Sequence, residues 1–283
     1  MMFLRAVRHD PQSLQQYAGL LAQCFPRARS SRRFSIEQLA WLYAHNPDGP
    51  ALGFDAVDND QLAAHYVLLP SRIRTEDGEV RALLSLNTAT HPAYQGRGLF
   101  TQLAGMALEK ARDEGFSAAY GVANANSTPG FVRKLGFDLI APLQARIGIF
   151  VPTLASPTRP QPELERIWTP ESLLWRSRWP ANPLLSAPAS TGGTLFQAPT
   201  PVPGLFATDQ LVAPITPSAR KHKGPLHLFL GLHPDSQGGV TMFTLPDWLK
   251  PSPLNLIFKP LQRGVAVPHA SKVRFSFLDF DAF

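Results

Sequence analysis

The strongest constraint on this chain is residues 87–101, where an apolar run typical of a strand leads through Pro92 into a glycine-containing loop and a long helix. Such a loop directs backbone N–H groups and a helix N-terminus at one point, which favours pyrophosphate binding. Gly96 and Gly98 permit phosphates to approach the backbone, and Arg97 adds positive charge at the rim. The loop is not a Walker loop, because no Gly-Lys-Ser/Thr follows, and not a Rossmann fingerprint, because the third glycine is missing.

The composition indicates a globular protein. Of the 283 residues, 44% are apolar and 17% are charged, which excludes general disorder. The net charge of +6 is mild for this length, and we expect no nucleic-acid partner. The single cysteine, Cys24, excludes an internal disulfide framework, and the histidine spacing predicts no metal site. No apolar run is long enough for a signal peptide or a membrane-spanning helix, which predicts a cytoplasmic protein.

Proline divides the chain into two compositions. Residues 1–150 contain 8 of the 28 prolines, and the seam at residues 151–162 is rich enough in proline to form a stiff linker. We therefore expect one domain over residues 1–150, a linker over 151–162 and a second domain over 163–283.

Hydrophobic periodicity predicts the elements of the two halves. In the first half, helices are expected at 12–24, 35–45, 101–115 and 129–135, and strands at 51–57, 61–69, 72–74, 80–89, 118–123 and 139–150. In the second half, a helix is expected at 170–179, with short strands at 194–198, 204–212, 225–232, 239–245, 254–258 and 272–280.

The two halves share a weak internal sequence similarity, which we call the internal echo. Trp41 is followed by Asn46-Pro47, and Trp175 is followed by Asn182-Pro183, in each case after an expected helix. Either the similarity is chance in a proline-rich chain, or the chain is a tandem duplication whose second copy has diverged.

Two motifs together resemble one family. Gln95-Gly-Arg-Gly-Leu-Phe100 resembles the acyl-CoA-binding motif of the GNAT superfamily of N-acyltransferases, which reads Gln/Arg-x-x-Gly-x-Gly/Ala. Downstream, Asn124 to Ser127 and Phe131 to Phe137 are similar to the family's second motif, an asparagine after a strand and then a short helix ending in Lys-Leu-Gly-Phe. The resemblance covers residues 1–150. The segment from Trp41 further resembles tandem-type GNAT proteins associated with surface-polysaccharide biosynthesis.

The resemblance implies an α/β (α+β) fold, in which a central mixed, splayed β-sheet is flanked by helices and followed by a smaller, β-rich, degenerate GNAT-like half. It also implies acetyl-CoA as co-substrate, bound in the cleft where two strands part. The residues that would contact the cofactor are Ala89, Thr90, Gln95, Gly96, Arg97, Gly98, Leu99, Phe100, Thr101, Asn124 and Asn126.

Three positions depart from the family pattern. Phe100 replaces the last small residue of the loop, so its ring must be housed elsewhere. Asn87 stands at the position of the glutamate that many relatives use as a base. Phe131 and Val132 stand where relatives carry the tyrosine that protonates the leaving thiolate. The usual acid and base are therefore missing, although orientation of an amine against an activated thioester supplies much of the rate by itself.

Few residues are placed to replace the missing general acid and base. Asn126 and Ser127 follow the fifth strand of the resemblance and would lie near the thioester, although Ser127 also suits the N-cap of the next helix. Tyr120 would point either into the cleft or into the core. The tail ending at Phe283 offers a further base, since tandem GNAT enzymes of the enhanced-intracellular-survival type bury a C-terminal carboxylate in the active site; the alternative is an ordinary edge strand.

The acceptor side and the activity follow from the same comparison. Arg29, Arg32 and Arg33 lie between the first two helices, where this fold lines the acceptor side, and would bind an anionic acceptor unless the loop is merely solvated. We predict direct acetyl transfer from acetyl-CoA to a small-molecule amine, such as an amino sugar, in a ternary complex. The alternative is a non-catalytic acyl-CoA sensor or scaffold, which the missing acid and base favour.

Overall fold

The computed structural model describes residues 1–26, 32–149, 161–182, 184–189, 193–212, 226–234, 242–246, 252–280 and 282. The helices are α1 (Pro11–Cys24), α2 (Ile36–Ala44), α3 (Leu99–Asp113), α4 (Thr128–Leu135) and α5 (Pro170–Ser177). The strands of the first half are β1 (Met2–Ala6), β2 (Leu52–Asp58), β3 (Gln61–Thr75), β4 (Gly78–Thr90), β5 (Ala118–Ala123), β6 (Asp138–Pro142) and β7 (Gln144–Gly148). Those of the second half are β8 (Leu164–Arg166), β9 (Leu185–Pro188), β10 (Thr194–Pro199), β11 (Leu205–Leu211), β12 (Leu226–Leu232), β13 (Met242–Thr244), β14 (Asn255–Pro260) and β15 (Val273–Ser276).

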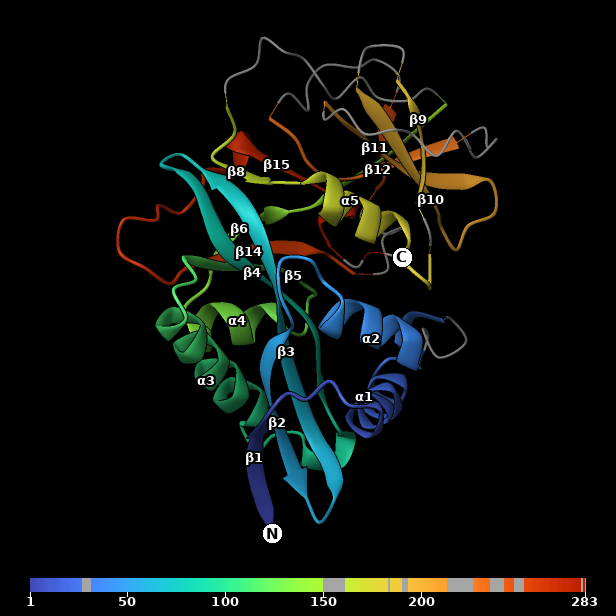
Figure 1. Ribbon diagram of the computed structural model, residues 1–283. Helices are drawn as coiled ribbons and strands as arrows, with labels where there is room; N and C mark the ends of the chain where they lie inside the picture. Colours follow the sequence, from blue (N-terminus) through green and yellow to red (C-terminus); the bar gives the residue numbers. More distant parts are fainter. Residues whose placement is uncertain are drawn as a thin grey trace.

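The first half is a mixed sheet between two helical layers. Strands β1 to β4 pair antiparallel in succession, and β5 lies parallel to β4. Helices α1 and α2 pack on one face and α3 and α4 on the other (Figure 1). The helix starts follow the sequence signals, since Asp10 caps α1 and Ser35 caps α2 through side-chain bonds to backbone N–H groups.

The second half repeats this order of strand directions. Strands β9, β10 and β11 pair antiparallel, and β12 lies parallel to β11, as β5 does to β4. The internal echo also has a structural counterpart, because the Trp41 and Trp175 rings stack with an interplanar angle of 4°. Asn46 and Asn182 make similar hydrogen bonds. The Asn46 side-chain amide donates to the carbonyl of Pro70 in β3, and that of Asn182 donates to the carbonyl of Pro199 at the end of β10. The two halves therefore share both the order of strand directions and the position of the tryptophan-bearing helix.

The halves complete each other's sheets. Strand β14, from the second half, inserts between β5 and β6, and β7, from the first half, pairs with β12 and β13. This exchange explains one error of the sequence analysis. The single strand expected at 139–150 is two strands, because the chain leaves one sheet at Pro142 and enters the other at Gln144. The expected domain division at 151–162 falls almost wholly outside the described residues and stays a prediction.

Other elements differ from their expected bounds. The strands expected at 61–69 and 72–74 are one continuous strand, β3, and β1, β8 and β9 were not predicted. The strand expected at 272–280 ends at Ser276, because a capping box between Ser276 and Asp279 starts a short 3-10 helix there.

A buried polar cluster joins β8, β11 and β15. The Arg274 guanidinium donates to both carboxylate oxygens of Asp209 and to the Gln210 carbonyl. Asp279 accepts hydrogen bonds from the Trp168 indole at 3.0 Å and from the Ser276 backbone N–H at 2.7 Å. Burial raises the pKa of Asp279 to about 6.

This raised pKa predicts a specific pH dependence of stability. The folded state binds the Asp279 proton more tightly than the unfolded chain, so this group's contribution is fully present below about pH 4 and is lost as the pH rises through about 6. The size is about 3 kcal/mol. Asp279→Asn should abolish this pH-dependent loss of stability. In urea unfolding between pH 4 and 7, the difference in unfolding free energy between variant and wild type should therefore change by nearly this amount, about 3 kcal/mol. Parallel pH profiles would contradict the assignment.

Candidate active site

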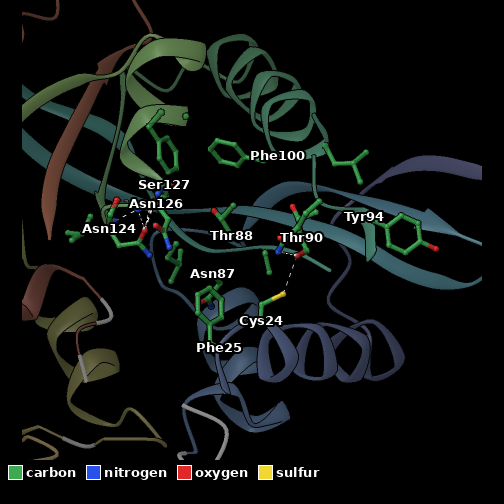
Figure 2. Close-up of a pocket in the computed structure, with 18 of the residues that line it drawn as sticks. Cys24, Phe25, Asn87, Thr88, Thr90, Tyr94, Phe100, Asn124, Asn126 and Ser127 are labelled. Carbon is green, nitrogen blue, oxygen red and sulfur yellow. Dashed lines mark hydrogen bonds between the residues drawn. The ribbon is translucent and has the colours of Figure 1, made fainter. Parts of the chain in front are cut away.

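The candidate site opens where β4 and β5 part. The two strands pair only from Ala82–Ala118 to Ser85–Gly121, and beyond this point β4 continues to Thr90 without β5 beside it. Asn87 has a left-handed backbone, φ 46°, within a bulge of β4. A cavity of about 690 Å³ occupies the resulting gap (Figure 2).

The glycine-containing loop borders this cavity. Gly96 and Gly98 have φ of 78° and 77°, a conformation that favours glycine. Gly98 is the N-cap of α3 and has no side-chain capping bond, and the first turn contains no acidic residue. The space where a β-carbon of Gly98 would lie is open. The first backbone N–H groups of α3 and the positive end of its dipole are therefore available to an anion.

The loop is fixed by neighbouring groups. The Gln95 side-chain amide donates to the Thr90 carbonyl at 3.3 Å, which ties the loop to the end of β4. Arg97 donates to the Ala93 carbonyl, and its guanidinium lies 4.8 Å from the centroid of the Tyr94 ring. These contacts hold the cationic side chain at the rim.

The unusual Phe100 is housed between α3 and α4. A β-carbon at Gly130 would lie 2.8 Å from Cε1 of Phe100, so the absence of a side chain at Gly130 makes room for the ring. The Phe100 ring also meets Phe131 at 5.0 Å and Tyr66 at 6.2 Å in edge-on contacts. The departure from the family motif therefore leaves the loop backbone unobstructed.

An asparagine turn follows β5 at the cavity wall. The Asn124 side-chain oxygen accepts from the backbone N–H groups of Asn126 and Ser127, each at 3.0 Å. Ser127 is the N-cap of α4 by position, but its hydroxyl makes no capping bond and instead contacts Asn124. The Asn124 carbonyl accepts from the Thr128 hydroxyl at 2.7 Å.

The opposite wall is mostly apolar. Cys24 and Phe25 come from the end of α1, and Phe34 lies just before α2. The Cys24 thiol donates to the Thr90 carbonyl at 3.4 Å, and burial raises the pKa of this thiol. Sequence reasoning missed this wall, and missed the three residues that the second half adds, Leu254, Phe280 and Ala282.

Most of the residues expected to contact the cofactor meet at one cavity. The following of them line it: Ala89, Thr90, Gln95, Gly96, Arg97, Gly98, Leu99, Phe100, Asn124 and Asn126. Thr101 does not. Of the catalytic candidates, Asn126 and Ser127 line the cavity, whereas Tyr120 is 1% exposed and donates to Ser71 in the core.

The residues expected to bind the acceptor do not all line the cavity. Arg33 lines the cavity, and Arg32 does not. Arg29 and Phe283 lie outside the described residues. Within the described part of the chain, no group of three or more His, Cys, Asp or Glu side chains could hold a metal ion.

Residues 6–140 match the family model of the acetyltransferase (GNAT) domain. This match covers just under half of the chain. Three solved structures are similar to this chain over 92% of its length. A GCN5-related N-acetyltransferase from Kribbella flavida is 15% identical, is covered over 71% of its own chain and has a TM-score of 0.60. A probable N-acyltransferase from Enterococcus faecalis and Eis1 from Mycobacterium abscessus are each 11% identical with a TM-score of 0.59, and are covered over 73% and 74% of their chains. No curated protein sequence matches this chain.

These findings confirm the main predictions from the sequence. The match to an acetyltransferase (GNAT) domain supports the predicted GNAT-type N-acetyltransferase and its acyl-CoA co-substrate. The solved structures confirm the mixed α/β fold, including the second half. No helix in the described part of the chain is long and apolar enough to cross a membrane.

Proposed function

We propose that the GNAT domain transfers an acetyl group from acetyl-CoA to a small-molecule amine by direct attack in a ternary complex. The observation that carries this proposal is the uncapped N-terminus of α3, which faces the gap between β4 and β5 behind two left-handed glycines. The backbone N–H groups from Gly96 to Thr101 would hold the pyrophosphate.

Polar groups along the cavity suit the rest of the co-substrate. Thr88 lines the cavity, and its hydroxyl is buried without a hydrogen-bond partner among the described residues. A hydrogen bond to the bound co-substrate would satisfy this hydroxyl. The backbone of Ala89 and Thr90 would hold the pantetheine arm, and Asn124 or Asn126 would contact it from the β5 side.

The chemistry needs few side chains. The amine nitrogen forms a bond to the thioester carbonyl carbon, the oxyanion is stabilised by a backbone N–H of β4 near Thr90, and the C–S bond breaks to release CoA. Ser127 would donate a hydrogen bond to the leaving sulfur. The test is release of the CoA thiol from acetyl-CoA with glucosamine, together with mass detection of the acetylated product.

A non-catalytic acyl-CoA sensor is the second candidate. It is favoured by one observation, that the described residues lining the cavity include no carboxylate, histidine or lysine. Binding of acetyl-CoA without turnover of any amine would support this candidate over the first.

The acceptor that we propose is an amino sugar carrying an anionic group, of the kind used in surface polysaccharides. Arg33 supplies positive charge at the acceptor wall. We expect Arg33→Gln to raise the KM for glucosamine 6-phosphate by about tenfold or more, because a charge-assisted hydrogen bond is lost. The KM for glucosamine and for acetyl-CoA should be unchanged.

Arg32→Gln is the matched control, since Arg32 is the preceding residue and does not line the cavity. Equal effects of the two variants, or an effect of Arg33→Gln on acetyl-CoA instead, would contradict the proposed anionic acceptor.

A further inference from the structure

A buried chain of hydrogen bonds ends at the cavity. Asn87 lines the cavity and donates its side-chain amide to the Tyr43 hydroxyl at 3.1 Å. The same hydroxyl lies 3.2 Å from Nε2 of His65, and Nδ1 of His65 lies 2.7 Å from the Asp55 carboxylate. Tyr43, His65 and Asp55 are 0–1% exposed, so the chain runs through the core from β2 to the bulge of β4.

The Asp55 carboxylate and the Tyr43 hydroxyl hold the two ring nitrogens of His65 from opposite sides. The oxygen of Tyr43 accepts from Nδ2 of Asn87. The amide oxygen, Oδ1, is left without a partner among the described residues, and it belongs to a side chain that lines the cavity.

The groups around His65 hold this arrangement. Tyr17, from α1, stacks on the imidazole at 4.2 Å and donates to the second oxygen of Asp55. Arg5, from β1, donates to the same oxygen at 3.3 Å. These groups, with Tyr43 from α2 and Asp55 from β2, are the titratable and charged neighbours of His65 or its carboxylate partner.

The described residues that line the cavity include no side chain that would take a proton from an ammonium group. Among the described lining residues the ionisable side chains are Cys24, Arg33, Tyr94 and Arg97. The pKa values of Cys24 and Tyr94 are raised, for Cys24 by burial, so these two groups are neutral near pH 7. The two arginines are cationic and disfavour a second positive charge.

We propose that Oδ1 of Asn87, oriented by the buried chain Tyr43–His65–Asp55, accepts a hydrogen bond from the attacking amine, which reacts in its neutral form. This inference rests on the proposed function. The lone pair of the neutral amine forms the N–C bond, the electron pair of the C–S bond leaves on the CoA sulfur, and the amine proton ends on the released thiol by way of solvent. Asn87 touches the substrate, whereas Tyr43, His65 and Asp55 are positioning residues.

The test compares two isomeric amines that differ in basicity, p-toluidine and benzylamine, whose rings suit the wall formed by Phe25, Phe34 and Phe280. CoA release is measured from pH 7 to 9. The kcat/KM for p-toluidine should be flat, and that for benzylamine should rise about tenfold per pH unit, because only its neutral form reacts. A titration in the p-toluidine profile would reveal a base in the site and overturn the inference.

Two substitutions distinguish a hydrogen bond from the amine to Asn87 from a purely structural role of Asn87. Asn87→Gly keeps the left-handed backbone and removes the amide, and should lower kcat/KM for p-toluidine roughly 3- to 10-fold. Asn87→Asp keeps the shape and adds a carboxylate, and should raise the benzylamine to p-toluidine rate ratio at pH 7 at least about tenfold. A purely structural residue would not change this ratio.

Variants of the positioning residue Tyr43 and of the control residue Asn59 complete the experiment. Tyr43→Phe should lower kcat/KM for p-toluidine about 3-fold with the KM for acetyl-CoA unchanged, because Asn87 loses the acceptor that orients it. Asn59 is also left-handed, φ 46°, but lies exposed in the turn between β2 and β3, so Asn59→Gly and Asn59→Asp should change none of these values.

Calorimetric titration of every variant with acetyl-CoA separates a failure of the proposed function from a failure of the role of Asn87. A wild-type protein that does not bind acetyl-CoA contradicts the proposed function. A protein that binds acetyl-CoA but turns over neither amine, or whose Asn87 variants behave as wild type, overturns the inference alone.

Discussion

Replacing Gly98 with tryptophan should lower the affinity for acetyl-CoA by on the order of 100-fold or more. Gly98 caps α3 with φ 77° and faces open space at the cavity. A bulky side chain there fills the position of the pyrophosphate and displaces at least two backbone hydrogen bonds to a charged group, each contributing about 1.5–3 kcal/mol. Calorimetric titration of acetyl-CoA measures the effect directly.

The matched control is Gly115→Trp. Gly115 follows the other end of α3, has φ 78° and also faces open space, so both variants suffer the same backbone strain. We expect both to lose similar stability and only Gly98→Trp to lose acetyl-CoA. Retained binding in Gly98→Trp would exclude the loop as the phosphate site.

Replacing Arg274 with methionine should lower the free energy of unfolding by about 3 kcal/mol or more. The Arg274 side chain is 12% exposed, and that of Asp209 is 1% exposed. Removing the guanidinium leaves the Asp209 carboxylate buried without its cation, close to Asp279, and an uncompensated buried charge of this kind destabilises strongly. Urea unfolding at pH 7 measures the change.

Lys272→Met tests whether burial, rather than the loss of any ion pair, causes this effect. Lys272 lies just before β15 and pairs with Glu163 at the surface, where its side chain is 58% exposed. Solvent-exposed pairs contribute little, so the unfolding midpoint should barely move. A similar loss in both variants would contradict the importance of burial.

Local signals predicted the first half well because each element there carries its own start, stop or period. Asp10, Ser35 and Gly136 mark helix ends in the sequence and do so in the structure. Strand β1 was missed because its five residues show no alternation, and its position depends on pairing with β2. The break at Leu143 was missed because it is caused by strands from the second half.

The site was predictable to a similar degree. The cofactor side was readable because left-handed glycines and the turn at Asn124 are fixed by residues close in sequence. The acceptor wall was not, because Phe25, Leu254 and Phe280 meet there only through the tertiary fold. The orientation of Asn87 was likewise hidden, since it depends on Tyr43, which is distant in sequence.

The exchange of strands between the halves governs how the chain is made. During translation β5 leaves the ribosome long before β14, so the partner of Ala123, which is Asn255, does not yet exist. Until then β5 presents an unpaired edge to the cell, the kind of edge that promotes aggregation. The cavity gains its last wall only when Phe280 arrives. The last wall of the site is therefore synthesised long after the glycine-containing loop that it faces.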